Sequence, residues 1–341
     1  MTSRSLPAAL LVLFLLTAAC VAEQPVRTTP PPSPSTSRTG EPQPPAPDPA
    51  AIAANELGDV PVLMYHRIVP EPGGVYDRTP ADFRAELVRL AEENYVPVTA
   101  AQYTAGDLDV PAGAHPVVLT FDDGDPSQFA LTPAGAPVPD TAVAILLDVA
   151  ESYPDFTPVA SFYVNADPFG DPGGTRTLPW LVANGMEVGN HTLTHENLGT
   201  LTAAAAQEEI AGGDQAIRAA APGTTPVTLA LPFGVHPDDR QIALRGSAGG
   251  FSYEYTGTLL VGADPAPSPF AAEFDPLRIP RIRSQGTEGE EAEFGSTSWL
   301  DQLAAAPERR YTSDGVADRI SYPLGTARAP AARFHARTFA Y

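Results

Sequence analysis

Short apolar runs alternate with segments of helical spacing from residue 60 onward. Runs of strand length occur at residues 60–66, 117–121, 159–164, 186–188, 227–231 and 279–282. Helical spacing occurs at residues 80–93, at 141–153 and within 202–220. Buried parallel strands read as continuous apolar runs and need crossover helices, so the pattern predicts an α/β fold with a mostly parallel sheet. The length of the pattern favours an irregular (β/α) barrel, and a doubly wound open sheet is the alternative.

Helix-start signals are sharpest before the first of these helices. Thr79 is a capping residue, Pro80 occupies the first helical position, and Asp82 places a carboxylate in the first turn. The third helical pattern is weaker, because Gly212 and Gly213 lie within it.

The chain begins with an export signal. Arg4 is the only charge before an apolar run over residues 6–19, which is too short to span a bilayer and ends in small residues before Cys20. Small residues before a single cysteine resemble the lipobox of bacterial lipoproteins. We therefore predict a lipoprotein signal peptide at residues 1–19 and a lipidated Cys20 that anchors the chain at the outer face of the cell membrane. An ordinary cleaved signal is the alternative.

A proline-rich segment follows the cysteine. Residues 21–50 contain ten prolines and few residues that could pack, so we predict a disordered tether over residues 20–56. The predicted folded domain occupies residues 57–295. Residues 296–341 have fewer apolar runs and are assigned as a C-terminal extension.

Composition excludes several classes of protein. The formal net charge of −21 argues against nucleic acid as a partner, because phosphates require a basic face. All basic residues are arginine, which excludes Schiff-base enzymes and phosphate-binding loops that depend on lysine. A single cysteine excludes an internal disulfide and a cysteine-rich metal site. No protein partner is implied.

Acids and histidines follow two of the predicted strands. Asp122 and Asp123 come directly after the run 117–121, where the strands of an α/β fold end in a cleft. Adjacent carboxylates are costly there unless a cation offsets them. His191 and His195 are spaced four residues apart after another strand, and imidazole and carboxylate are suitable ligands for first-row metals. Together they predict a site with two histidines and one carboxylate for a divalent metal.

These segments resemble the polysaccharide deacetylase family, the NodB-homology or carbohydrate esterase family 4 class. The similar segments occur in the family's order at residues 62–68, 120–124, 160–164, 185–195 and 231–234. The resemblance implies an irregular (β/α) barrel of the NodB-homology type.

The resemblance also implies a role for each site residue. Asp123, His191 and His195 would hold a divalent metal, usually zinc, with a water in an open position. Asp122 would be the general base, and the backbone N–H of Phe233 would stabilise the oxyanion.

The sequence departs from the family at two positions. Many members carry an arginine where this chain has Ala230, and we hypothesise that Arg281 supplies the missing cation near Asp122; a surface arginine is the alternative. The family's late Leu-x-His motif, whose histidine protonates the leaving amine, is missing. His66 and His236 are candidates to replace it.

The predicted function is therefore a metal-dependent hydrolase that removes N-acetyl groups from a cell-wall or surface polysaccharide of N-acetylglucosamine-type units. A non-catalytic, metal-containing, glycan-binding envelope lipoprotein with a degenerate deacetylase fold is the alternative. A glycoside hydrolase that uses Asp122 and Asp123 is disfavoured, because adjacent residues do not easily place two carboxylates on opposite sides of a glycosidic bond.

Overall fold

The computed structural model describes residues 47–341. The predicted signal peptide, Cys20 and the tether up to residue 46 lie outside the described residues. Within residues 47–341, no helix has the length and apolar content that a membrane crossing requires.

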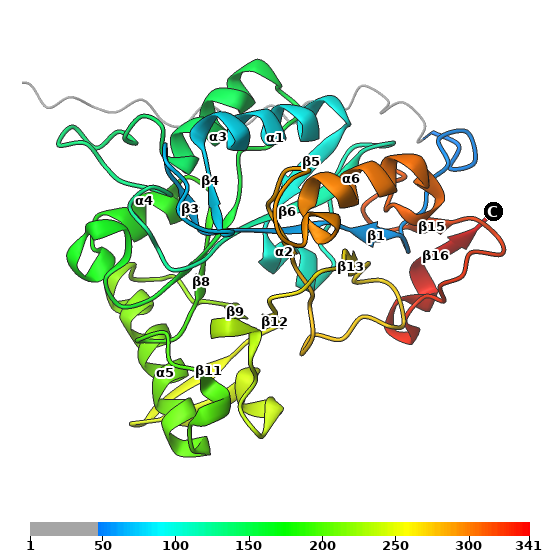
Figure 1. Ribbon diagram of the computed structural model, residues 1–341. Helices are drawn as coiled ribbons and strands as arrows, with labels where there is room; N and C mark the ends of the chain where they lie inside the picture. The colour runs from blue at the N-terminus through cyan, green and yellow to red at the C-terminus, as the bar shows by residue number, and fades with distance from the viewer. Residues whose placement is uncertain (1–46) are drawn as a thin grey trace, which may run out of the picture. The chain divides into compact units, whose positions relative to one another are not determined.

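A curled parallel sheet is the centre of the fold (Figure 1). Its strands run in the order β12-β9-β8-β7-β6-β2-β14, with β5 paired to β6 as well, and every pairing is parallel. The strands are β2 (Val62–Tyr65), β5 (Tyr95–Val98), β6 (His115–Phe121), β7 (Ser161–Val164), β8 (Glu187–Asn190), β9 (Thr228–Ala230), β12 (Gly257–Leu259) and β14 (Ile282–Arg283).

The two ends of this sheet meet. Parallel bridges join Leu259 to Ile279 and Gly262 to Ile282, and the Leu260 N–H donates to the Ile279 carbonyl at 2.8 Å. The sheet therefore closes on itself through irregular backbone, which confirms the predicted irregular (β/α) barrel over the open-sheet alternative.

Helices cover the outside of the sheet. They are α1 (Pro80–Glu92), α2 (Ala100–Ala105), α3 (Ala142–Ser152), α4 (Thr177–Ala183), α5 (Ala203–Ala220) and α6 (Ser296–Ala305). The predictions at 80–93, 141–153 and 202–220 are confirmed, and Thr79 caps α1 by accepting from the Asp82 N–H at 3.0 Å. Sequence reasoning missed the short helices α2, α4 and α6.

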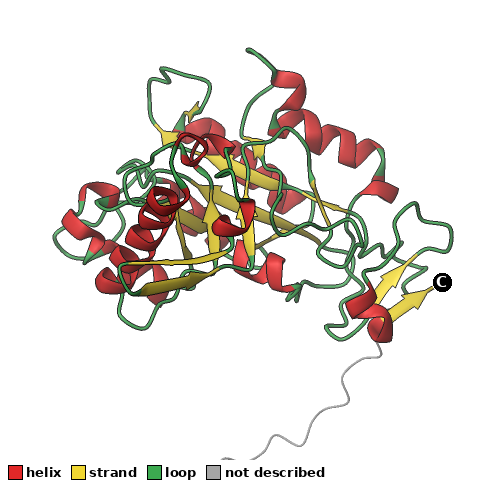
Figure 2. Cartoon of the chain, turned by 90° about the horizontal axis from the view of Figure 1, so that it is seen from below, coloured by secondary structure: helices red, strands yellow, loops and turns green. Residues whose placement is uncertain are grey.

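Small two-stranded sheets lie around the barrel, as Figure 2 shows with strands in yellow. They pair β1 (Asp59–Val60) with β13 (Ala266–Pro267), β3 (Arg67–Ile68) with β4 (Asp77–Arg78), β10 (Arg245–Ala248) with β11 (Phe251–Glu254), and β15 (Ile320–Tyr322) with β16 (Thr338–Ala340). The hairpin β10–β11 packs beside α5 (Figure 1).

Alternation along β6 separates two layers of the core. Val117, Leu119 and Phe121 pack with residues of α1 and α3, whereas Val118 belongs to a second cluster together with residues of β2, β9 and β12. Successive side chains of a strand point to opposite faces. Thr120 therefore shares the face of Val118, and its hydroxyl lies within hydrogen-bond reach of Arg281.

The predicted domain boundaries at residues 56 and 295 do not coincide with breaks in packing. Ala54, Asn55 and Glu56 are buried, so the predicted tether extends too far at its C-terminal end. Leu300 of α6 and Ile320 of β15 belong to the two core clusters that also contain barrel residues. The region assigned as an extension is therefore part of the same compact unit.

Glu56 fastens the start of this unit to its C-terminal part. Its carboxylate accepts from the Ser321 N–H at 2.7 Å and from the Tyr311 hydroxyl at 3.2 Å. Burial, together with the nearby charge of Asp314, raises the pKa of Glu56 to about 7.

This pKa predicts a pH-dependent stability. Between its ordinary pKa of 4.5 and about 7, folded Glu56 keeps a proton that the unfolded chain has released, so the free energy of unfolding falls as the pH rises through that window. The titration of Glu56 should change the free energy of unfolding by on the order of 2–3 kcal/mol across this window. Urea unfolding at pH 5 and pH 7.5 should show a smaller fall in Glu56→Gln than in the wild type. Equal falls would contradict the prediction.

Candidate functional site

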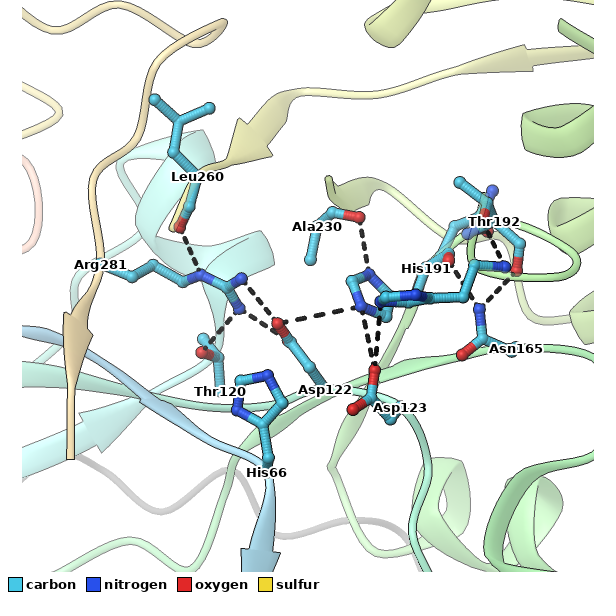
Figure 3. A network of polar contacts seen from close by, with 12 residues as sticks. His66, Thr120, Asp122, Asp123, Asn165, His191, Thr192, Ala230, Leu260 and Arg281 are labelled. Atoms are coloured by element: carbon cyan, nitrogen blue, oxygen red, sulfur yellow. Dashed lines mark hydrogen bonds and ion pairs between the residues drawn. The ribbon is translucent and has the colours of Figure 1, made fainter. Parts of the chain in front are cut away.

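The predicted site residues meet at the carboxyl ends of the strands (Figure 3). Asp122 and Asp123 follow β6, and His191 and His195 follow β8. Arg281 arrives from the closing edge of the barrel, immediately before β14. Parallel strands bring the aspartates and histidines to one edge, although they are far apart in sequence. Arg281 precedes its strand and reaches Asp122 with its long side chain.

Asp122 and Arg281 form a buried, bidentate ion pair. The two terminal guanidinium nitrogens each donate to a different Asp122 oxygen at 2.6 Å, and both side chains are almost fully buried. Burial alone would raise the pKa of Asp122, but the charges of Arg281 and His191 hold it well below its usual range. The pairing keeps the Asp122 carboxylate ionised and fixed in orientation.

Further hydrogen bonds hold both partners of this pair in place. The Leu260 carbonyl accepts from Arg281 Nε at 2.8 Å, next to the bridges that close the barrel. The Gln128 side chain donates to the carbonyls of His66, at 2.6 Å, and Asp122. Sequence reasoning did not identify Gln128, because a glutamine in a Pro/Gly-rich loop carries no signal of its own.

Asp123, His191 and His195 present three donor atoms to one point. Asp123 Oδ1 lies 3.3 Å from His191 Nε2 and 3.4 Å from His195 Nε2. All three donor atoms lie within 4.8 Å of one another. Ligands of a tetrahedral zinc ion are separated by about 3.4 Å, given bonds of about 2.1 Å. The donor set and its spacing therefore fit a divalent metal.

Hydrogen bonding orients His191 for this purpose. Its Nδ1 lies 2.8 Å from the Ala230 carbonyl, so a proton on Nδ1 leaves the Nε2 lone pair facing Asp123. Burial lowers the pKa of His191, but Asp122 and Asp123 outweigh burial and raise it above its ordinary value. Ala230 thus serves the site through its backbone, although it lacks the side chain that many family members carry there.

Strained backbone recurs at the site residues. Asp123, His195 and Phe233 have φ values of 77°, 63° and 58°, in the left-handed region that non-glycine residues seldom adopt. Such conformations cost free energy and persist where surrounding structure enforces them. In this chain they occur in three strand-end loops, after β6, β8 and β9, whose side chains meet at the site.

The loop that carries the histidines is fastened to α5. Asn190 donates to the Ile210 carbonyl at 2.8 Å and to the Tyr255 hydroxyl at 2.7 Å, and Tyr255 donates to the buried Asp214 at 3.1 Å. Asn190 Oδ1 in turn accepts from the Thr192 N–H at 2.8 Å. Sequence reasoning missed Tyr255 and Asp214, which contact no metal donor and lie on other elements.

The glycine pair in α5 permits this close approach. A Cβ on Gly213 would collide with Asn190 Oδ1 and lie 2.8 Å from the Thr192 carbonyl carbon. A Cβ on Gly212 would meet only the Leu193 side chain, with Cδ2 nearest at 3.0 Å. The helix therefore continues through both glycines, because packing against the loop compensates for their low helix propensity.

Phe233 lies in the short turn that follows β9. Its side chain is 60% exposed, and its ring centroid is 4.8 Å from that of His195. Within residues 47–341, its N–H donates to no protein acceptor, whereas the N–H groups of Gly234 and Val235 bond within the turn. The backbone donor assigned to the oxyanion thus has no protein partner within the described residues, and the ring of the same residue contacts His195.

The two spare histidines lie in different places. His66 lies beside Asp122 in Figure 3, and burial lowers its pKa against the opposing influence of Asp122 and Asp123. His236 is surrounded instead by Arg240, Asp275 and Arg278. The structure therefore brings His66, and not His236, to the site.

A parallel β/α barrel with an aspartate pair and two histidines at its carboxyl end is the arrangement that the resemblance to polysaccharide deacetylases implied. The sequence profile of that family, described as polysaccharide deacetylase, matches residues 109–246. A chitooligosaccharide deacetylase of Bradyrhizobium sp. is 31% identical over 145 residues, which are 42% of this chain and 57% of that protein. One of Sinorhizobium fredii is 32% identical over 127 residues, which are 37% of this chain and 51% of that protein. The chain thus spans little more than half the length of these relatives.

Solved structures share the fold. The Streptococcus pyogenes deacetylase PplD, in complex with acetate, has a TM-score of 0.52 at 20% identity, with 71% of this chain and 97% of that chain covered. A polysaccharide deacetylase from Bacillus cereus has a TM-score of 0.52 at 23% identity, with coverages of 73% and 68%. The chain therefore has the NodB-type fold, and its resemblance to polysaccharide deacetylases is confirmed.

The α5 glycines provide a matched test of the support for the histidine loop. Gly213→Ala should lower the free energy of unfolding by about 2 kcal/mol, because its methyl group displaces Asn190 and Thr192. It should also weaken Zn²⁺ binding by about 10–100-fold. Gly212→Ala should change neither by a comparable amount, since the flexible Leu193 side chain can move. Urea unfolding and zinc titration measure both variants, and equal effects would contradict the assignment.

Proposed function

We propose that this protein is a metal-dependent hydrolase that removes N-acetyl groups from a cell-wall or surface polysaccharide built of N-acetylglucosamine-type units. The observation that carries the proposal is the Asp122–Arg281 pair beside the cluster of Asp123, His191 and His195. A carboxylate held ionised next to a metal-type donor set suits hydrolysis of an amide. The named activities of the chitooligosaccharide deacetylases support the substrate class.

The reaction adds water across the acetyl C–N bond and yields acetate and a free amine. Asp122 accepts the proton of the attacking water, and a general base contributes about 10²–10⁴-fold. Arg281 acts through Asp122, because its two hydrogen bonds leave the carboxylate in one orientation. The Phe233 N–H donates to the oxygen that becomes negative as the carbonyl carbon turns tetrahedral.

We further propose zinc as the metal, because two imidazoles and one carboxylate form a common zinc donor set with an open position. Bound by Asp123, His191 and His195, the ion would polarise the acetyl carbonyl and lower the pKa of water.

The leaving amine needs a proton, and His66 is our candidate to donate it. The Gln128 side chain joins the backbone of His66 to that of Asp122. His66 Nδ1 is buried and has no hydrogen-bond partner in the part of the chain that the structure describes.

We also propose export of the protein and anchoring at the outer face of the cell membrane through lipidated Cys20. The support is the apolar run that ends in small residues before the chain's single cysteine.

Acetate release tests the proposed activity. Purified protein with Zn²⁺ should release acetate from N-acetylglucosamine oligosaccharides or peptidoglycan fragments. Asp122→Asn should lower turnover by about 10²–10⁴-fold with unchanged zinc content, because the amide cannot accept the proton. Asp125→Asn is the matched control, since its side-chain oxygen can still accept from the Ser127 N–H. No acetate from the wild type with several metals, or equal release by Asp122→Asn, would refute the activity. Glycan binding without release would favour a non-catalytic binding protein.

Arg281→Lys tests the positioning role of the arginine. Lysine keeps the charge but cannot make two parallel hydrogen bonds, so turnover should fall by about two orders of magnitude while zinc still binds. Removing the charge in Arg281→Gln should also lower the free energy of unfolding by about 3–5 kcal/mol, because Asp122 loses its buried partner. Unchanged turnover in both variants, with zinc bound, would show that Arg281 does not position the base.

A further inference from the structure

Two exposed aromatic rings contact histidines of the site. The Tyr76 ring centroid lies 4.6 Å from that of His66, and Tyr76 is 39% exposed. The Phe233 ring contacts His195 on the other flank. Figure 3 shows His66 and His191 on two sides of Asp122 and Asp123, and the His191 ring lies 4.8 Å from that of His195. The two aromatic residues thus contact different histidines of the site, Tyr76 contacting His66 and Phe233 contacting His195.

The segment that carries Tyr76 is held in place. Asp77 accepts from Arg67 Nε and from the Gly73 N–H, each at 2.8 Å, and residues 67–68 pair with residues 77–78. A fixed loop presents the tyrosine ring at a defined position, so little conformational entropy is lost when a ligand packs on it.

Arginine covers part of the ring and leaves the rest open. The Arg283 guanidinium lies 5.6 Å from the Tyr76 ring centroid, and Gln285 Oε1 accepts from that guanidinium at 2.7 Å. Tyr76 belongs to none of the three buried core clusters of residues 47–341. The ring is therefore positioned without serving the core.

Exposed apolar residues gather at the same two segments. Four of the nine large hydrophobic residues that are exposed within residues 47–341 lie in them, namely Val75, Tyr76, Phe233 and Val235, and a fifth, Val261, lies against Gly234. Gly234 brings the Phe233 turn against Val261, because a Cβ on Gly234 would lie 3.0 Å from Val261 Cβ. Scattered exposed hydrophobics need no explanation, but a concentration around a site indicates a ligand surface.

We propose that Tyr76 is a specificity-determining residue that stacks on the sugar unit next to the one being deacetylated, with Phe233 as the opposite wall. The proposal rests on the proposed function. The C–H faces of a pyranose ring are apolar and pack on aromatic rings, as other flat apolar surfaces do. A substrate that packs on both rings while its acetyl group lies at Asp122 would have several linked units. The protein therefore acts on chains of at least three sugars in preference to a monosaccharide or disaccharide.

The dependence of the reaction on chain length tests this proposal. We compare acetate release from the di-, tri- and tetrasaccharides of N-acetylglucosamine with Zn²⁺ present. In Tyr76→Ala, the ratio of kcat/KM for the tetrasaccharide to that for the disaccharide should fall about tenfold. Tyr76→Phe and Tyr76→Trp should retain the ratio, because the ring and not the hydroxyl makes the contact.

Phe339→Ala is the matched control. Phe339 of β16 is 45% exposed, and its ring centroid lies 5.4 Å from the Arg319 guanidinium carbon. It therefore resembles Tyr76 in exposure and in having an arginine over its ring. This variant should keep the wild-type ratio. An unchanged ratio in Tyr76→Ala, or an equal fall in Phe339→Ala, would overturn the proposal.

Binding separates this proposal from the proposed function. Calorimetric titration with the tetrasaccharide should show a Kd about tenfold higher for Tyr76→Ala than for the wild type. If the wild type binds the tetrasaccharide through Tyr76 but releases no acetate, the proposed activity fails and the stacking role stands. If the wild type releases acetate and Tyr76→Ala binds equally well, the stacking role fails alone. If the wild type neither binds nor reacts, both fail.

Discussion

The buried ion pair between Asp122 and Arg281 is the interaction on which the site depends. Two charges removed from water are costly, and their attraction offsets this cost only where geometry is good and the remaining donors are satisfied. Both conditions hold here, because Arg281 makes two bonds to Asp122 and a third to the Leu260 carbonyl. That carbonyl belongs to the backbone that closes the barrel. The backbone that closes the sheet thus also holds the guanidinium that orients the carboxylate.

A second constraint is the close contact between α5 and the histidine loop. The loop adopts left-handed conformations at Thr192 and His195, which an isolated strand-to-helix turn would not hold. Asn190 links this loop to Ile210 of the helix and, through Tyr255, to Asp214. The approach is possible only because residue 213 has no Cβ. A feature that weakens a helix in sequence therefore serves the metal-type site in the folded protein.

Strand and helix patterns with strong periodicity were predictable, and weaker ones were not. In the helix after Thr79, the capping residue, the proline at the first helical position and the apolar spacing all indicate the same helix. Local sequence alone therefore specified it. The helices α2, α4 and α6 are short, and their stability comes from packing that local sequence does not report. The boundary placed at residue 56 failed for the same reason: Glu56 is polar, but tertiary partners at Tyr311 and Ser321 make its burial tolerable.

Sequence by itself determined which chemical groups are available and where on the strands they stand. Asp122 and Asp123 after one strand, and His191 and His195 after another, already predicted a shared edge, because parallel strands end together. Tertiary structure decided which distant residues complete the site. Arg281 is 159 residues from Asp122, and they meet because β14 pairs with β2, which in turn pairs with β6. The pairing of Tyr65 with Phe121 places His66 beside Asp122, and the chain after β9 leaves His236 among other charges. Neither position follows from spacing along the chain, because it depends on which strands pair.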